Sequence, residues 1–291
     1  MRGVGVSSGA VTVVNALATG IGCAVAISLP VRVDLELRRA DGIGSHRIQL
    51  ERGSDTPLVR ETLDTGLSLY APGEVFSGEL RVDSHVPVGK GLKSSSAVGG
   101  AVLRAVADTL RQPRPPEELA RLAADIAQQI GLSATGAYDD CLAALRGGVV
   151  LTDNAHRTAL RAAPFDSDLC VVLWIPPESH APSTTWYERF QLETEAGRAV
   201  VEAARAGRWT EAMTLNTELV ERVVGYDYRP LRSDLLRAGA VMCGVSGMGP
   251  ALAAFVPRSG VESVVPRLPT DRGEVRVVDI RPEDGPSMEA S

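Results

Sequence analysis

Alternating polar and apolar residues dominate the first third of the chain and predict strands there. The alternation favours strands at Val4–Val14, Gly22–Leu37 and Gly78–Val86, which are also rich in β-branched valine. Residues 40–57 hold glycine, aspartate and serine, so we expect a turn-rich excursion between the second and third of these strands.

Apolar residues at helical spacing take over after residue 95. They predict one helix at Ser95–Leu110 and a second at about Pro116–Ile130, with prolines after the first and Gly131 after the second. Later elements come in mixed order: a short helix at Ala137–Leu145, strands at Val149–Thr152 and Leu169–Ile175, helical stretches at Thr184–Ala206, Trp209–Val224 and Pro230–Gly239, and a strand on either side of Gly247–Gly249. This mixture of strands and helices predicts an α+β fold.

The character of the pattern changes after Asn154, which suggests two lobes. We expect residues 1–155 to form an N-terminal lobe and residues 156–282 to form a C-terminal lobe. Residues 283–291 are small and acidic, and they predict a disordered tail.

The segment between the third strand and the first long helix, Pro87–Ala97, is the strongest candidate for chemistry. It holds the only two lysines of the chain and two glycines that permit close approach of the backbone. Its serines lead into the N-terminus of a helix, which is a ready site for an anion. The segment, called the phosphate loop below, therefore predicts a nucleotide phosphate site that is not a P-loop, because the P-loop spacing is absent. Its expected contacts are Gly89, Lys90, Gly91, Leu92, Lys93, Ser94, Ser95 and Ser96.

Composition narrows the range of partners. The formal net charge of −6 gives no basic field, so we expect no nucleic-acid partner. Four widely spaced cysteines without a C-x-x-C pair are typical of reduced thiols in a cytoplasmic protein.

The apolar segment Ala10–Pro30 is interrupted by glycine, threonine and asparagine, so we expect neither a signal peptide nor a membrane span.

Several segments together resemble the GHMP kinases, the superfamily of galactokinase, homoserine, mevalonate and phosphomevalonate kinases. The phosphate loop resembles their second motif in the form found in archaeal-type shikimate kinases. The other matching segments follow in the family's order: Gly9–Gly20, Thr135–Asp140, Gly147–Asn154, Gly225–Asp227 and Val245–Pro250. The resemblance implies an N-terminal ATP-binding lobe with a mixed sheet, a ferredoxin-like C-terminal lobe, and ATP with Mg²⁺ as cofactors.

The resemblance also implies roles for particular residues. Asp139 matches the acid that contacts the substrate hydroxyl, and Asp140 is its alternative or a supporting group, although both could merely cap a helix. Adjacent helical residues point about 100° apart, so we expect only one of the two to face the site. Ser96 is implied as the Mg²⁺ ligand. Gly247 and Gly249 are implied behind the phosphate loop, and the substrate side is expected at Thr12, Asn15, Thr19 and Gly20.

Four positions depart from the family pattern. Ile21 replaces a lysine, Met248 a threonine and Ala251 a serine, and Gln128 lies where other branches carry a metal-binding glutamate. Three functions therefore stay open: phosphorylation of shikimate or a related cyclitol carboxylate, phosphorylation that drives elimination or decarboxylation, and ligand binding without catalysis. A homodimer is possible in each case.

Overall fold

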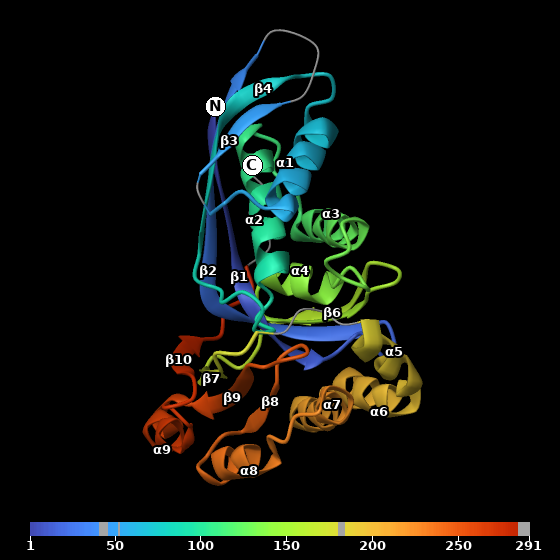
Figure 1. Cartoon of the computed structure of the whole chain (residues 1–291), viewed down its shortest axis with the longest axis vertical. Helices are drawn as coiled ribbons and strands as arrows, with labels where there is room; N and C mark the ends of the chain where they lie inside the picture. Colours follow the sequence, from blue (N-terminus) through green and yellow to red (C-terminus); the bar gives the residue numbers. More distant parts are fainter. Residues whose placement is uncertain (41–45, 52, 180–183, 285–291) are drawn as a thin grey trace.

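The computed structural model describes residues 1–40, 46–51, 53–179 and 184–284 (Figure 1). Its first sheet has six strands, in the order β3-β4-β2-β5-β6 with β1 paired to β2. The strands are β1 (Arg2–Val14), β2 (Ile21–Arg39), β3 (Arg47–Leu50), β4 (Phe76–Ser84), β5 (Val149–Asp153) and β6 (Thr158–Ala163). A mixture of sheets and helices follows along the whole described chain, which confirms the α+β class.

The two longest strands form an antiparallel hairpin that reaches from one end of the molecule to its middle (Figure 1). The register runs from Arg2 opposite Glu36 to Val14 opposite Cys23. The turn between the strands, residues 15–20, therefore lies where the two halves of the molecule meet.

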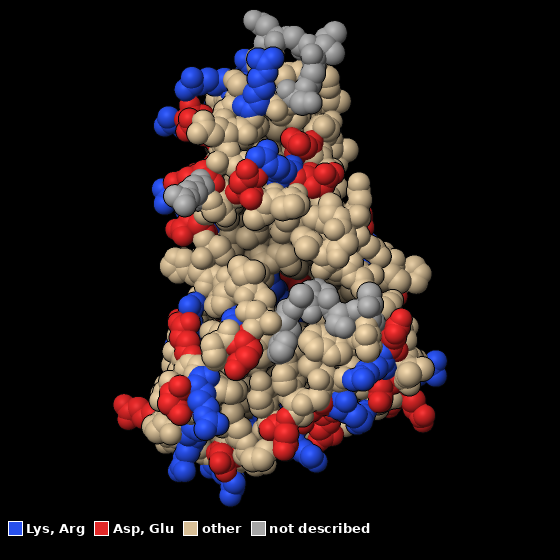
Figure 2. Space-filling model, in the orientation of Figure 1, with Lys and Arg blue, Asp and Glu red and all other residues tan. Residues whose placement is uncertain are grey.

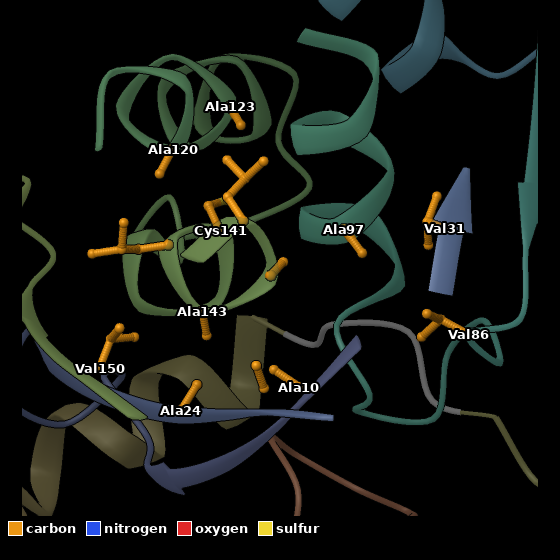
Figure 3. Close-up of a cluster of buried hydrophobic side chains, with 14 of the residues drawn as sticks. Ala10, Ala24, Val31, Val86, Ala97, Ala120, Ala123, Cys141, Ala143 and Val150 are labelled. Carbon is orange, nitrogen blue, oxygen red and sulfur yellow. The ribbon is translucent and has the colours of Figure 1, made fainter. Parts of the chain in front are cut away.

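Four helices cover one face of the first sheet: α1 (Pro57–Tyr70), α2 (Ser94–Thr109), α3 (Pro116–Gln129) and α4 (Tyr138–Arg146). Helix α2 packs directly on β1, because a Cβ on Gly5 would overlap the backbone of Ala101. Small side chains fill the space between α3 and α4, where Ala120 points toward Cys141, and Ala143 on the other side of α4 points toward Ala24 of β2 (Figure 3). This close packing fixes the N-termini of α2 and α4 relative to the sheet.

The second sheet has four antiparallel strands in the order β10-β7-β9-β8, with helices on it. Numbered along the chain, that order is 4-1-3-2, which is the order of a ferredoxin-like β-α-β-β-α-β unit. The strands are β7 (Leu169–Ile175), β8 (Met242–Val245), β9 (Leu252–Pro257) and β10 (Glu274–Asp279). The helices are α5 (Thr184–Leu192), α6 (Thr194–Arg205), α7 (Trp209–Val224), α8 (Arg229–Arg237) and α9 (Val261–Val264), with 3₁₀ turns at Arg258–Gly260 and Val265–Arg267.

Three sequence expectations need correction. The turn-rich excursion at 40–57, of which residues 41–45 and 52 lie outside the described residues, contains β3, and the helix α1 follows it. The expected helix at 184–206 is two helices, since α5 ends before Glu193 and α6 begins after it. Strands β6 and β10 were not expected; β6 is mostly exposed, so it lacks the apolar alternation of a half-buried strand.

The boundaries at the end of each lobe also shift. Strand β6 pairs with β5, so a boundary at residue 155 would divide a hairpin, and we propose a boundary after Ala163 instead. Of the expected disordered tail, Glu283 and Asp284 are ordered: Glu283 pairs with Arg146 at 2.6 Å, and Asp284 donates its N–H to the Arg146 carbonyl. Residues 285–291 lie outside the described residues. No helix in the described part of the chain is long and apolar enough to cross a membrane.

Candidate active site

A cavity of about 340 Å³ lies between the two sheets, and the elements predicted to carry chemistry meet in it. Its volume falls within the range of small-molecule sites. The residues that line it come from the end of β1 and the turn after it, the phosphate loop, the end of α3 and the connector to α4, the start of α4, helix α5 and the turn after β8: Thr12, Val14, Asn15, Ala16, Leu17, Val88, Gly89, Gly91, Leu92, Lys93, Ser94, Ser95, Ser96, Ala127, Leu132, Ser133, Thr135, Ala137, Asp139, Asp140, Trp186, Gly247, Met248 and Gly249.

The phosphate loop has the backbone of an anion site. Gly89, Gly91 and Lys93 all have positive φ, at 71°, 79° and 71°. Lys93 is also the N-cap residue of α2, and its side chain makes no capping hydrogen bond. The N–H groups of the first turn of α2 are therefore not capped by that side chain, and the positive end of the helix dipole meets the cavity at Ser94, Ser95 and Ser96.

The turn after β8, residues 246–251, is called the glycine turn below, and it supports the phosphate loop from behind. Ser246 Oγ donates to the Gly91 carbonyl at 2.7 Å and accepts from the N–H of Thr12 at 3.1 Å. The N–H of Gly247 donates to Thr12 Oγ1 at 2.9 Å. A side chain at Gly91 would overlap the Ser246 carbonyl, so only glycine allows this approach. Gly247 and Gly249 both line the cavity.

Asn15 connects the hairpin turn to the same region. Its Nδ2 donates to the Gly247 carbonyl at 3.2 Å, and its N–H donates to Asn216 Oδ1 on α7 at 2.7 Å. Thr12 and Asn15 therefore lie in the cavity wall and join the two halves of the molecule, and their contact with a substrate stays a prediction.

Both aspartates at the start of α4 line the cavity, which corrects the expectation that only one would. The helix begins at Tyr138 and presents its first turn end-on, so neighbouring side chains reach the same space. They do not cap the helix, because the N-cap position belongs to Ala137, in the left-handed region with φ 51°. Both carboxylates are buried, with residue exposures of 4% for Asp139 and 7% for Asp140.

Asp140 pairs with Lys93 across the cavity. Lys93 Nζ lies 3.2 Å from Asp140 Oδ2, and the two side chains are 12% and 11% exposed. The other carboxylate oxygen, Oδ1, is buried and has no hydrogen-bond partner among the residues that the structure describes. Burial raises the pKa of Asp140, and the Lys93 ammonium opposes that rise. Among the described residues that line the cavity, Lys93 is the only lysine or arginine.

Asp139 is held by a different set of contacts. Its Oδ1 accepts from Asn154 Nδ2 at 2.8 Å, and its N–H donates to Asn154 Oδ1 at 3.2 Å. Thr152 Oγ1 donates to the same amide oxygen and fixes its orientation. The carboxylate lies against Gly22 of β2, where a Cβ would overlap it. Burial, and then the neighbouring Asp140 charge, raise the pKa of Asp139 to about 7.

Comparison with known proteins places this site in a family. The profile named GHMP kinases N terminal domain matches residues 58–148. A shikimate kinase of Methanothrix thermoacetophila is 36% identical over 91% of this chain and 89% of its own length. A shikimate kinase of Pyrococcus furiosus is 35% identical over 88% of this chain and 92% of its own. The chain belongs to the GHMP kinases, together with these archaeal shikimate kinases.

Solved structures of GHMP kinases have the same fold. A putative homoserine kinase from Listeria monocytogenes superposes with a TM-score of 0.68 at 23% identity, covering 97% of each chain. The mevalonate kinase of Methanococcus jannaschii gives a TM-score of 0.74 at 13% identity, covering 96% of this chain and 98% of its own. At these identities the likeness concerns the fold alone.

Lys90 does not line the cavity of this GHMP kinase, which corrects its expected role as a phosphate contact. Its ammonium donates to three successive carbonyls after β7, those of Pro176, Pro177 and Glu178, at 2.9, 2.6 and 2.5 Å. An ammonium has three donors, and these contacts use all of them. Lys90 therefore ties the phosphate loop to the second sheet.

Two expected substrate contacts are also placed elsewhere. Neither Thr19 nor Gly20 lines the cavity; Thr19 lines a separate hollow with Ile21 and residues of α6. Helix α6 packs closely on this turn, since a Cβ on Gly197 would lie 2.8 Å from Ala18 and Thr19. The turn from residue 18 onward thus faces α6 rather than the cavity.

Sequence reasoning missed Asn154 and Trp186. Asn154 orients Asp139, and its signal was a buried Thr-x-Asn at the end of a strand, where polar side chains need partners. Trp186 on α5 lines the cavity from the second half of the chain, and no motif marks it. Cys141 follows the aspartates, but burial raises its pKa to about 12, so its thiol stays protonated near neutral pH.

Proposed function

We propose that this protein phosphorylates a hydroxyl group of shikimate, or of a closely related cyclitol carboxylate, with ATP as the phosphoryl donor. The observation that carries the proposal is the cavity in which a buried carboxyl group with a pKa of about 7, Asp139, lies together with the phosphate loop and Lys93. A base titrating near 7 suits proton transfer at neutral pH. The names of its archaeal relatives, which match over about nine tenths of the chain, support shikimate as the acceptor.

The residues of the cavity have separate roles in the proposed phosphoryl transfer. The acceptor hydroxyl gives its proton to Asp139 as its oxygen attacks the terminal phosphorus of ATP. The new O–P bond forms while the bond from that phosphorus to the bridging oxygen breaks, and ADP leaves with the electron pair. Lys93 and the N–H groups at the start of α2 stabilise the negative charge on the transferred phosphoryl group.

Mg²⁺ completes this proposal, and the residues present fit it. No group of three or more histidine, cysteine, aspartate or glutamate side chains could hold a metal within the described ranges. That suits Mg²⁺, which takes one or two protein oxygens and completes its shell with phosphate and water. Ser96 lines the cavity and can offer its hydroxyl. Bound with the nucleotide, the ion would neutralise charge on the phosphate oxygens.

The cellular compartment and the oligomeric state of the protein stay predictions. The four cysteines are free and buried, which supports a reducing compartment such as the cytoplasm. A homodimer remains possible. A small molecule is the only partner that the proposed reaction needs.

One assay tests the function. The protein is incubated with ATP, Mg²⁺ and shikimate, and mass spectrometry identifies the nucleotide and the organic product. The proposal predicts ADP and a shikimate monophosphate in equal amounts. Free phosphate with a dehydrated or decarboxylated product would indicate phosphorylation-driven elimination. Binding of ATP without turnover of shikimate or related cyclitol acids would indicate a ligand-binding protein.

A further inference from the structure

The buried carboxylate oxygen of Asp140 needs an explanation. One oxygen of this group, Oδ2, pairs with Lys93, but the other, Oδ1, is buried and finds no partner in the described part of the chain. A buried charged oxygen without a partner costs free energy, so native proteins rarely keep one without a purpose. Asp140 also lines the cavity, so a ligand that enters the cavity can reach it.

A cation is the ligand that fits this oxygen. The phosphate loop provides Ser96, a residue that lines the same cavity and is only 7% exposed. A carboxylate and a hydroxyl are both hard oxygen donors of the kind that Mg²⁺ takes alongside nucleotide phosphates. Lys93 cannot serve both oxygens equally, because its ammonium lies on Oδ2.

The residue at the family's glutamate position is engaged elsewhere. Gln128 on α3 accepts from Arg157 Nη2 at 2.7 Å through Oε1, and its Nε2 donates to the Ala134 carbonyl at 3.1 Å. It does not line the cavity. An amide held in this way leaves the metal without a carboxylate from α3.

We infer that Asp140 supplies the carboxylate ligand of the nucleotide-bound divalent cation, with Ser96 as its neighbour and in place of a ligand from α3. The inference rests on the proposed use of Mg-ATP. Asp140 then bridges two cations, with Lys93 on Oδ2 and the metal on Oδ1, while Asp139 stays available for the acceptor hydroxyl. The two adjacent aspartates thus have separate tasks.

The test measures metal binding rather than activity. The affinity of Mn²⁺ for the complex of the full-length protein with ADP is measured from the signal of free Mn²⁺ in electron paramagnetic resonance. Calorimetry gives the affinity for ADP in EDTA. Loss of groups that merely support a metal ligand costs about 10–100-fold in metal affinity, so Asp140→Asn should weaken Mn²⁺ at least about tenfold. Its affinity for metal-free ADP should change by less than about threefold.

The matched control is Gln128→Ala. It removes the side chain at the family's glutamate position, and it should leave Mn²⁺ affinity within about threefold of the wild type. An unchanged Mn²⁺ affinity in Asp140→Asn would overturn the inference. Equal losses of affinity for metal-free ADP and for metal-bound ADP would also overturn it, because they would mean that Asp140 acts only through Lys93. A wild type that binds no nucleotide would instead refute the proposed function itself.

A second variant covers the case in which Asp140→Asn does not fold. Asp140→Cys replaces the carboxylate by a thiol, whose thiolate prefers zinc over magnesium. If Zn²⁺ strengthens ADP binding relative to Mg²⁺ more in the variant than in the wild type, residue 140 ligates the metal directly. The same metal preference in both proteins contradicts it.

Discussion

The two sides of the cavity are built by different means. The phosphate side, residues 88–96 with the glycine turn, is made of backbone: positive φ angles, helix N–H groups and a close approach of Gly91 to Ser246. The side that we propose for the acceptor holds residues 12, 14–17, 127, 132, 133, 135, 137 and 139 with Trp186, and it is made of side chains from both halves of the chain. Backbone sites suit a phosphate group common to many reactions, whereas side-chain walls can be fitted to one acceptor.

The face of the molecule shown in Figure 2 carries no large patch of a single charge. On the face shown in Figure 2, positive and negative side chains are mixed at both ends of the molecule, and the middle is largely uncharged. We expect selectivity between acceptors to come from the cavity wall itself, where Lys93 is the only described lysine or arginine.

On the phosphate side, we expect a single added methyl group to weaken ATP binding strongly. Gly91→Ala brings a Cβ into overlap with the Ser246 carbonyl at a positive φ. Left-handed backbone alone costs a non-glycine residue about 1–3 kcal/mol, and the overlap adds to it. Calorimetric titration should show ATP affinity lowered by a factor of ten or more, which is at least about 1.4 kcal/mol.

Gly131→Ala is the matched control for that change. Gly131 also has a positive φ, of 74°, but no atom of the described residues lies within 4 Å of the added Cβ. The variant should lose about 1 kcal/mol of unfolding free energy and keep its ATP affinity. Equal effects on ATP affinity in both variants would mean that the contact with Ser246 is unimportant.

On the acceptor side, one added methyl group can displace the carboxylate of Asp139. Gly22→Ala places a Cβ on the carboxylate of Asp139 and displaces it from Asn154. We expect kcat to fall by about tenfold to a hundredfold, because misplacement of a reacting group by about 1 Å can cost 10²-fold. Calorimetry should show unchanged ATP affinity; a loss of ATP binding equal to the loss of turnover would show that the two sides are not separable.

The smallest effect is expected at Lys90, which joins the phosphate side to the second sheet. Lys90→Met keeps the length of the side chain and removes the three hydrogen bonds to residues 176–178. Because Lys90 is only partly buried, we expect a loss of about 1 kcal/mol of unfolding free energy in urea titrations. Activity should change little, and a variant that loses ATP binding as strongly as Gly91→Ala would restore Lys90 as a phosphate contact.

The sequence revealed the phosphate side far better than the acceptor side, for a physical reason. Glycines, serines and lysines that shape a phosphate site lie within ten residues of one another, so their spacing is visible along the chain. The contacts of Lys90 with residues 176–178 and of Gly22 with Asp139 join residues more than 80 positions apart, and Trp186 reaches the cavity from the second half of the chain, so they arise only when the chain folds. For the same reason the sequence placed Thr19 and Gly20 near the substrate, whereas packing of α6 directs that turn away.

The adjacent aspartates illustrate the same limit. Their motif identified them as candidates, but a helical projection predicted that only one would face the site. The projection fails because both belong to the first turn of α4, which meets the cavity end-on. Their separate partners, Asn154 for Asp139 and Lys93 for Asp140, became visible only in the folded chain.

The central claim is that Asp139 is the base for phosphoryl transfer, and the pH dependence of kcat tests it most directly. Because burial raises the pKa of Asp139 to about 7, the wild type should lose activity as pH falls through about 7, where the carboxylate takes up a proton. Asp139→Asn should lower kcat by about 10²–10⁴-fold, abolish that pH dependence, and leave ATP affinity intact. An Asp139→Asn variant that keeps the wild-type kcat and the same pH profile would contradict the account.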